Sequence, residues 1–92
     1  MEKETALNQV IRMARDPNSK REYNMLREII VSILREDGDT YVDIGKTIAR
    51  SHASVIHIHK VYEFDMENCE AFRFIRDAVV EKIYKEEIES GE

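Results

Sequence analysis

Residues 40–62, TYVDIGKTIARSHASVIHIHKVY, decide the fold that the sequence predicts, because they read as two short helices joined by a tight turn. Thr40 can cap the first helix, which we expect over about 41–49. Ser51 can cap the second helix through its hydroxyl oxygen. The apolar positions that would face a core are Val42, Ile44 and Ile48 in the first helix and Val55, Ile58 and Tyr62 in the second. The stretch therefore predicts a helix-turn-helix over about residues 40–64.

The segment before this motif carries the strongest helical pattern of the chain, over about residues 20–36. Ser19 and Glu22 are spaced as a capping box at its start, and Gly38 can end it because glycine adopts left-handed geometry without a Cβ clash. Its apolar residues lie at i, i+1, i+4, i+5, i+8 and i+9: Met25, Leu26, Ile29, Ile30, Ile33 and Leu34. We expect this helix to be the central element of the core.

Two further helices are expected at the ends of the chain. The first covers about residues 2–16 and stops before Pro17, because proline disfavours helical geometry in the residue before it. The last covers about residues 67–88, after a turn at residues 64–66, and it is acidic. The predicted fold class is all-α: a compact bundle of about five helices in a single domain over residues 1–92.

The composition agrees with a small helical domain, at 42% hydrophobic and 36% charged residues. Three glycines and one proline are too few for the many turns of a β-sandwich or barrel. No apolar run approaches the roughly 18 residues of a membrane span, and the first residues do not read as a signal peptide. We therefore expect a cytoplasmic protein with no membrane partner.

The formal net charge of −5 argues against nucleic-acid binding until the charge is divided along the chain. Residues 63–92 carry four basic and ten acidic residues, whereas residues 1–62 carry ten basic and nine acidic residues. Charges farther apart than a Debye length of about 8 Å are largely screened at physiological salt. A neutral or basic face can therefore coexist with the acidic C-terminal helix.

The turn and the first residues of the second helix of the motif form the candidate binding surface. Free amide groups and the positive end of the helix dipole favour a phosphate there. Arg50 could bind a phosphate or a guanine edge, and His52 a base edge or a phosphate. Ser51 belongs to the same candidate DNA contact surface, Ser54 could bind a phosphate, and Ala53 could pack on a thymine methyl. The other interpretation is a capped, solvated helix start without a ligand.

The same segment resembles the C-terminal origin-binding domain of the DnaA replication initiator, a helix-turn-helix of the Trp-repressor-like superfamily. That family has an Ile-Gly pair, a Gly-Gly-Arg-Asp-His-Thr-Thr turn and a Val-Leu-His-Ala helix in these places. The resemblance spans roughly residues 20–64. It is carried by Asp43, Ile44, Gly45, Arg50, His52, Ser54, Val55, Ile56, His57, Tyr62 and Glu63.

The resemblance implies double-stranded DNA as the partner, and it allows a homodimer. It aligns Arg27 with a family arginine that enters the minor groove, although a surface salt bridge to Glu22 or to neighbouring carboxylates is an equal alternative. Lys46 and Lys60, with Lys20 or Arg21, are expected to hold the phosphate backbone; the other interpretation of each is a solvated basic side chain. His57 is either on the DNA side or a packing residue.

Three departures from the family pattern fall on base-reading positions. One turn glycine is missing, Ser51 replaces the family's aspartate, and Ala53 replaces its first threonine. The family's DNA sequence preference therefore does not carry over. The initiator's ATPase domain is also absent from this sequence, so no nucleotide binding is implied.

Metal and enzyme chemistry find little support in the sequence. No two of His52, His57 and His59 have the i, i+4 spacing of helical zinc ligands, and His59 lies nearer the apolar side of its helix, as a core-edge histidine with a hydrogen bond would. Cys69 is on an apolar stripe, and the chain has no glycine-rich phosphate loop. We expect no catalytic residues, no metal and no cofactor.

Two hypotheses follow from the sequence. The first is a non-enzymatic DNA-binding protein in transcription or replication control, with a DnaA-like helix-turn-helix. The second is a protein-interaction module that kept the fold and lost the DNA face. Its support is the acidic tail, the altered turn and the apolar residues Phe64, Phe74, Val80 and Tyr84.

Overall fold

The computed structural model describes the backbone of residues 4–90 and the side chains of residues 4–86. These residues form five helices and no strand, so the predicted all-α fold class is confirmed. The helices are α1 (Ala6–Arg15), α2 (Arg21–Glu36), α3 (Tyr41–Ile48), α4 (His52–Asn68) and α5 (Glu70–Ser90). None of them is long and apolar enough to cross a membrane.

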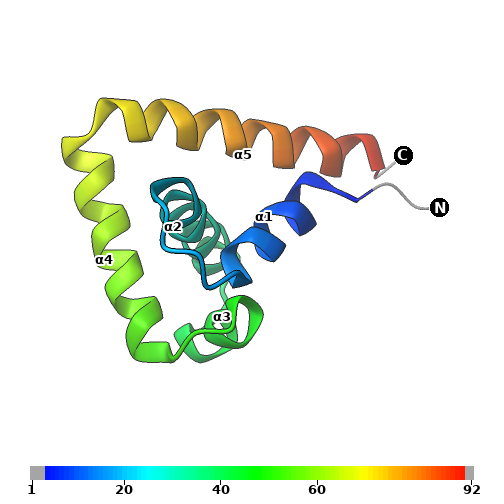
Figure 1. Ribbon diagram of the computed structural model, residues 1–92. Helices are drawn as coiled ribbons and strands as arrows, with labels where there is room; N and C mark the ends of the chain where they lie inside the picture. Colours follow the sequence, from blue (N-terminus) through cyan, green and yellow to red (C-terminus); the bar gives the residue numbers. More distant parts are fainter. Residues whose placement is uncertain (1–3, 91–92) are drawn as a thin grey trace.

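Helix α2 is the centre of the bundle, as the sequence predicted. The other four helices surround it: α5 crosses the top in Figure 1, α4 descends one side, α3 lies at the bottom and α1 lies opposite α4. Ile29, Ile30 and Val31 of α2 have no exposed surface. Burial of each such side chain contributes roughly 1.5–3 kcal/mol of transfer free energy.

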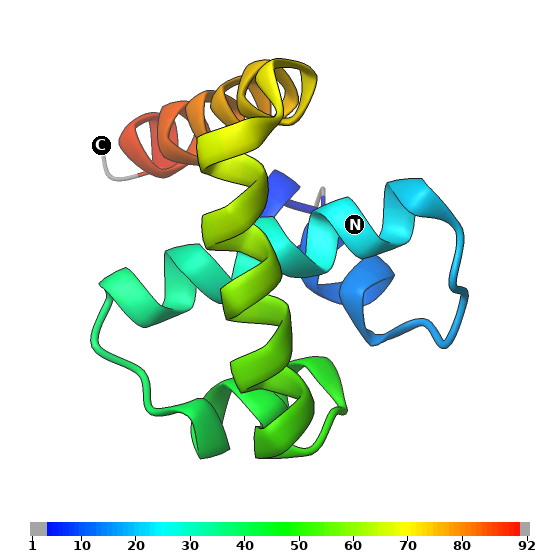
Figure 2. The same ribbon diagram turned by 90° about the vertical axis from the view of Figure 1, so that its left-hand side faces the viewer.

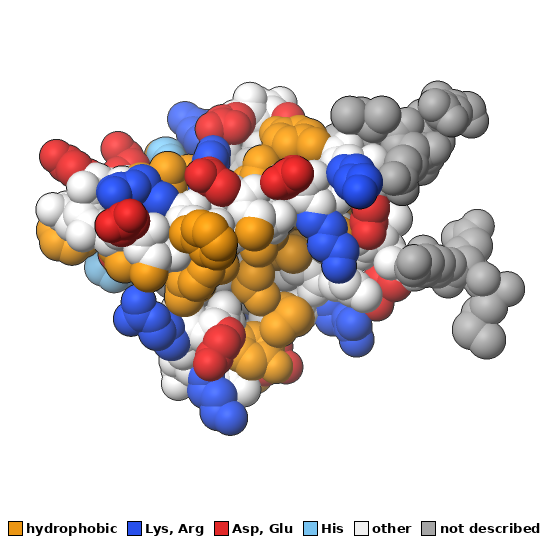
Figure 3. All heavy atoms as spheres, turned by 90° about the horizontal axis from the view of Figure 1, so that it is seen from above, with side chains coloured by type: hydrophobic (Ala, Val, Ile, Leu, Met, Phe, Trp, Pro, Cys, Tyr) orange, Lys and Arg blue, Asp and Glu red, His pale blue; other side chains and the backbone are white. Residues whose placement is uncertain are grey.

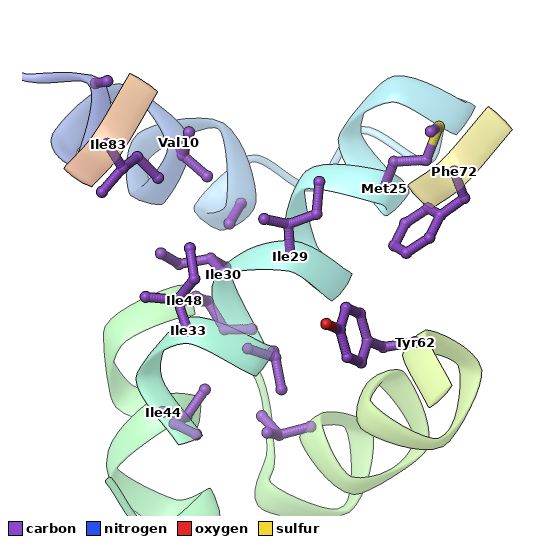
Figure 4. Close-up of a cluster of buried hydrophobic side chains, with 14 residues drawn as sticks. Val10, Met25, Ile29, Ile30, Ile33, Ile44, Ile48, Tyr62, Phe72 and Ile83 are labelled. Atoms are coloured by element: carbon purple, nitrogen blue, oxygen red, sulfur yellow. The ribbon is translucent and has the colours of Figure 1, made fainter. Parts of the chain in front are cut away.

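The remaining helices all supply side chains to this core. Figure 4 shows Val10 of α1, Ile44 and Ile48 of α3, Tyr62 of α4 and Phe72 and Ile83 of α5 around the isoleucines of α2. Helices α3 and α4 are therefore anchored through Ile44, Ile48, Val55 and Tyr62, all of which are buried.

Three helices begin at the hydroxyl caps that the sequence offers. Thr5 accepts a hydrogen bond from the Asn8 amide, Thr40 from the Asp43 amide, and Ser51 from the Ser54 amide. Gly38 follows the end of α2 with a φ of 98°, which is the left-handed region that favours glycine.

The capping box predicted at Ser19 is wrong. Helix α2 begins after Lys20, which makes no side-chain cap. The preceding turn is built by other side chains, because Asp16 Oδ1 accepts from the Asn18 amide and Asn18 Oδ1 accepts from the Lys20 amide. These side chains close the turn at Lys20, so α2 starts one residue later than a Ser19 cap would place it.

The turn predicted at residues 64–66 is also wrong. Helix α4 continues to Asn68, and the chain turns at Cys69, whose φ of −126° and ψ of 102° are extended. No residue of the 64–66 segment is a glycine or proline, so nothing there interrupts the helical hydrogen bonds. The first helix is likewise shorter than predicted within the described residues, beginning at Ala6 after its Thr5 cap.

Candidate nucleic-acid interface

The connection between α3 and α4 is a tight turn that depends on two small residues. Ala49 ends α3 in the left-handed conformation, with φ 57° and ψ 49°. The Arg50 amide donates to the Gly45 carbonyl oxygen at 2.8 Å. A Cβ atom on Gly45 would lie 2.4 Å from the Arg50 carbonyl oxygen, so only glycine allows this approach.

The first turn of α4 lies at the surface. Its residues His52, Ala53 and Ser54 are exposed, and none of them is acidic. The Ser51 hydroxyl caps the helix and contacts the Ser54 hydroxyl at 3.0 Å. Figure 2 shows this end of α4 beside α3, at the opposite end of the molecule from α5.

Arg50 is half-buried, and part of its guanidinium group is already bound. Nη2 donates to the Asp16 carbonyl oxygen at 3.0 Å, and Nη1 donates to the Ala49 and Ile48 carbonyl oxygens at 3.1 and 3.4 Å. Two of its five N–H groups have no partner among the described residues. Arg50 thus ties the α1–α2 loop to the turn and keeps limited capacity for an anion.

Arg27 occupies neither of the two places that the sequence suggested. Its side chain is only 5% exposed, so it reaches neither a groove of DNA nor Glu22. Nε donates to the Ala14 carbonyl oxygen at 3.2 Å, and Nη2 donates to the carbonyl oxygens of Asp16 and Asn18. Burial, and then the nearby charge of Arg50, lower the pKa of Arg27. Its role in the structure is to fix the α1–α2 loop.

The other predicted contact residues differ in their surroundings. Lys46, His57 and Lys60 are exposed, which agrees with a surface role. His59 is the core-edge histidine that the sequence predicted, because its Nδ1 lies 2.9 Å from the Tyr41 hydroxyl.

A cavity of about 720 Å³ brings several of these residues together between α2, α4 and the α1–α2 loop. Its walls include Arg50, Ala53, Ser54 and His57, together with the buried Arg27; Lys46 and Lys60 lie outside it. The candidate interface is therefore concave beside the first turn of α4, where the sequence predicted only a projecting helix end.

Glu28 is the residue of this cavity that the sequence analysis missed as a functional group. It is 5% exposed, and its Oε1 atom has no hydrogen-bond partner within the described part of the chain. Burial, together with a hydrogen bond to Asp65, raises the pKa of Glu28 to about 8. A carboxylate inside the apolar run MLREIIVSIL was the available signal.

Other chemistry is sparse in the described part of the chain. No group of three or more His, Cys, Asp or Glu side chains could hold a metal ion there. Cys69 is half-buried at the break between α4 and α5, where its Sγ accepts from the Phe72 amide at 3.4 Å. It thus takes part in starting α5.

Comparisons of the chain with protein-family models, with curated proteins and with solved structures found no match.

Proposed function

We propose that this protein is a non-enzymatic, double-stranded DNA-binding protein in transcription or replication control. In this proposal α3 and α4 act as a helix-turn-helix, and the first turn of α4 enters the major groove. The observation that carries the proposal is the exposure of His52, Ala53 and Ser54 at a helix N-terminus without acidic residues. Helix dipole and free amides make this end attractive to a polyanion.

The contacts divide by chemistry. His52 can donate to a base edge or a phosphate, and Ala53 is small enough to lie against a thymine methyl group. Lys46 and Lys60 are exposed and can neutralise backbone phosphates. Arg50 can add a phosphate contact through its two remaining N–H groups.

The distribution of charge supports this orientation. The acidic excess belongs to residues 63–92, and α5 lies at the end of the molecule opposite the α3–α4 turn (Figure 1). The molecule measures 36 × 29 × 26 Å, which is several Debye lengths at physiological salt. The acidic helix therefore repels DNA weakly at the proposed interface.

Fluorescence anisotropy with a labelled duplex of mixed sequence tests the proposal. We expect saturable binding at low salt, and we expect His52→Ala to weaken it about tenfold without changing the melting temperature, because His52 is exposed. Lys82→Ala on α5 is the matched control and should bind as tightly as the parent chain. Equal affinity of the His52→Ala variant and the parent would argue against the proposed recognition surface.

The second candidate function is a protein-interaction module. It is favoured by two exposed aromatic side chains, Phe64 at 64% and Phe74 at 77% exposure. Figure 3, which looks onto the α5 side, shows hydrophobic side chains between the charged ones. A second copy of the chain is the first partner to test, since a dimeric helix-turn-helix doubles its DNA contacts.

A further inference from the structure

The cavity beside α4 has a part, lined by Glu28, Ile58 and Val61, that the DNA proposal does not use. On α4 the cavity is lined by Ala53, Ser54, His57, Ile58 and Val61. Asp65 follows one helical turn after Val61. At 1.5 Å per residue, Asp65 lies about 16 Å along the helix axis from Ser54. The cavity therefore extends from the proposed DNA surface toward the Glu28–Asp65 pair.

The walls of this cavity carry both basic and acidic side chains. Arg50 and His57 line it near the start of α4, and Arg27 and Glu28 line it from α2. Ile58 and Val61 provide apolar wall between them along α4. Such a volume, within the range of about 300–1,000 Å³ for small-molecule pockets, suits a compact ligand with an apolar body and one polar head.

Glu28 carries a buried oxygen atom, Oε1, that has no hydrogen-bond partner among the described residues, although its carboxyl group also interacts with Asp65. The side chain is 95% buried. The nearby arginines do not supply a donor. Arg27 donates to backbone carbonyl oxygens and to Asn24 Oδ1, and the charge of Arg21 has the smallest effect on the pKa of Glu28. A buried acceptor without a donor destabilises the protein by about 1–3 kcal/mol.

From the buried, unpartnered Oε1 of Glu28, the neighbouring Asp65 carboxyl and the apolar wall of Ile58 and Val61, we propose that this cavity binds a small primary amine with a hydrocarbon or aromatic body. The ammonium group donates to Oε1 of Glu28, whose carboxyl group lies beside that of Asp65, and the body lies against Ile58 and Val61. An ammonium group has three donors and no acceptor, which matches a site of two carboxyl groups.

Binding of an amine at this site changes the protonation state of Glu28. The empty site holds a proton on Glu28 at neutral pH, because burial and Asp65 raise the pKa of Glu28 to about 8. An ammonium ion stabilises the ionised carboxyl group and lowers this pKa. The other ionisable groups that face Glu28 and its cavity are Asp65, Arg21, Arg27, Arg50 and His57. Binding therefore releases a proton from Glu28 to the buffer.

Isothermal titration calorimetry with phenethylamine, and with phenylacetate as the anion of similar shape, tests this inference in the absence of DNA. We expect saturable binding of phenethylamine and none of phenylacetate. The heat should differ between buffers of different ionisation enthalpy, which reports the released proton. Glu28→Gln should weaken binding more than about tenfold and remove the buffer dependence.

Glu28→Gln keeps the shape of the protonated carboxyl group, and circular dichroism checks that it remains helical. As a second measurement, amide NMR shifts on adding phenethylamine should concentrate on the α2 and α4 residues that line the cavity. Absence of amine binding, preference for phenylacetate, or unchanged affinity of Glu28→Gln would each overturn the inference. Because no DNA is present, these outcomes are independent of the proposed DNA-binding function.

Discussion

At the scale of single residues, the arginines show how tertiary contacts change a prediction made from type and spacing. Arg27 of α2 and Arg50 of the α3–α4 turn both donate to the Asp16 carbonyl oxygen. A helical wheel places Arg27 beside an apolar stripe but does not show that the α1–α2 loop folds over it. His59 was predictable because helical spacing places it near the Val55 and Tyr62 side of α4, where its ring meets the Tyr41 hydroxyl.

Glu28 gives a residue-scale prediction on stability. Its pKa is near 4.5 in the unfolded chain and about 8 in the folded protein, so the folded state binds the proton more tightly. The free energy of unfolding should therefore fall as the pH rises from about 4.5 to about 8. Glu28→Gln should remove this fall and be more stable than the parent at pH 8 by about 1–2 kcal/mol.

Urea denaturation at pH 5 and at pH 8 measures this effect. Glu22→Gln is the matched control, because Glu22 is exposed on the same helix. The claim that the Glu28 carboxyl is buried and protonated would be contradicted by either of two results. One is a parent chain whose free energy of unfolding does not decrease from pH 5 to pH 8, and the other is a Glu28→Gln variant that shows the same decrease as the parent.

At the scale of elements, the caps and the core stripe were predictable because they depend on neighbours three or four residues away. Thr40 and Ser51 cap α3 and α4 as their spacing indicates. The start of α2 and the α4–α5 break were not predictable in this way. Two acceptor side chains, Asp16 and Asn18, shape the first, and the second falls at Cys69 without a glycine or proline.

The α3–α4 turn gives a paired prediction. Gly45→Ala should destabilise the fold by about 1–3 kcal/mol, because its Cβ would meet the Arg50 carbonyl oxygen. Ala49→Gly should stabilise it by about 1 kcal/mol, because Ala49 is held at φ 57°. Thermal unfolding followed by circular dichroism measures both changes. A stabilising Gly45→Ala or a destabilising Ala49→Gly would show that the turn has another geometry.

At the scale of the whole molecule, the all-α bundle follows from composition and periodicity, whereas the cavity does not. The cavity needs α2, α4 and the α1–α2 loop to meet, and these contacts join residues far apart in the sequence. The net charge of −5 likewise does not predict whether a face of the protein can bind DNA, because the acidic excess belongs to the C-terminal third of the chain.

The exposed face of α5 gives a prediction about assembly. Ala71, Phe74, Ile75 and Ala78 are exposed and lie at i, i+3, i+4 and i+7, a spacing that suits helix packing. We expect the chain to form a homodimer through this face, and Phe74→Ser to shift it to the monomer in sedimentation velocity. Lys82→Ser is the control on the same helix. A parent chain that remains monomeric at high concentration would rule this dimer out.

The salt dependence of DNA binding tests the central claim most directly, because counterion release reports how many phosphates the protein neutralises. With Lys46, Lys60 and Arg50 as phosphate contacts, log K should fall against log salt with a slope of about −3 per chain. Lys46→Ala should reduce that slope by about 1. Binding that is absent at about 50 mM salt, or a slope near zero, would contradict DNA recognition by the α3–α4 surface.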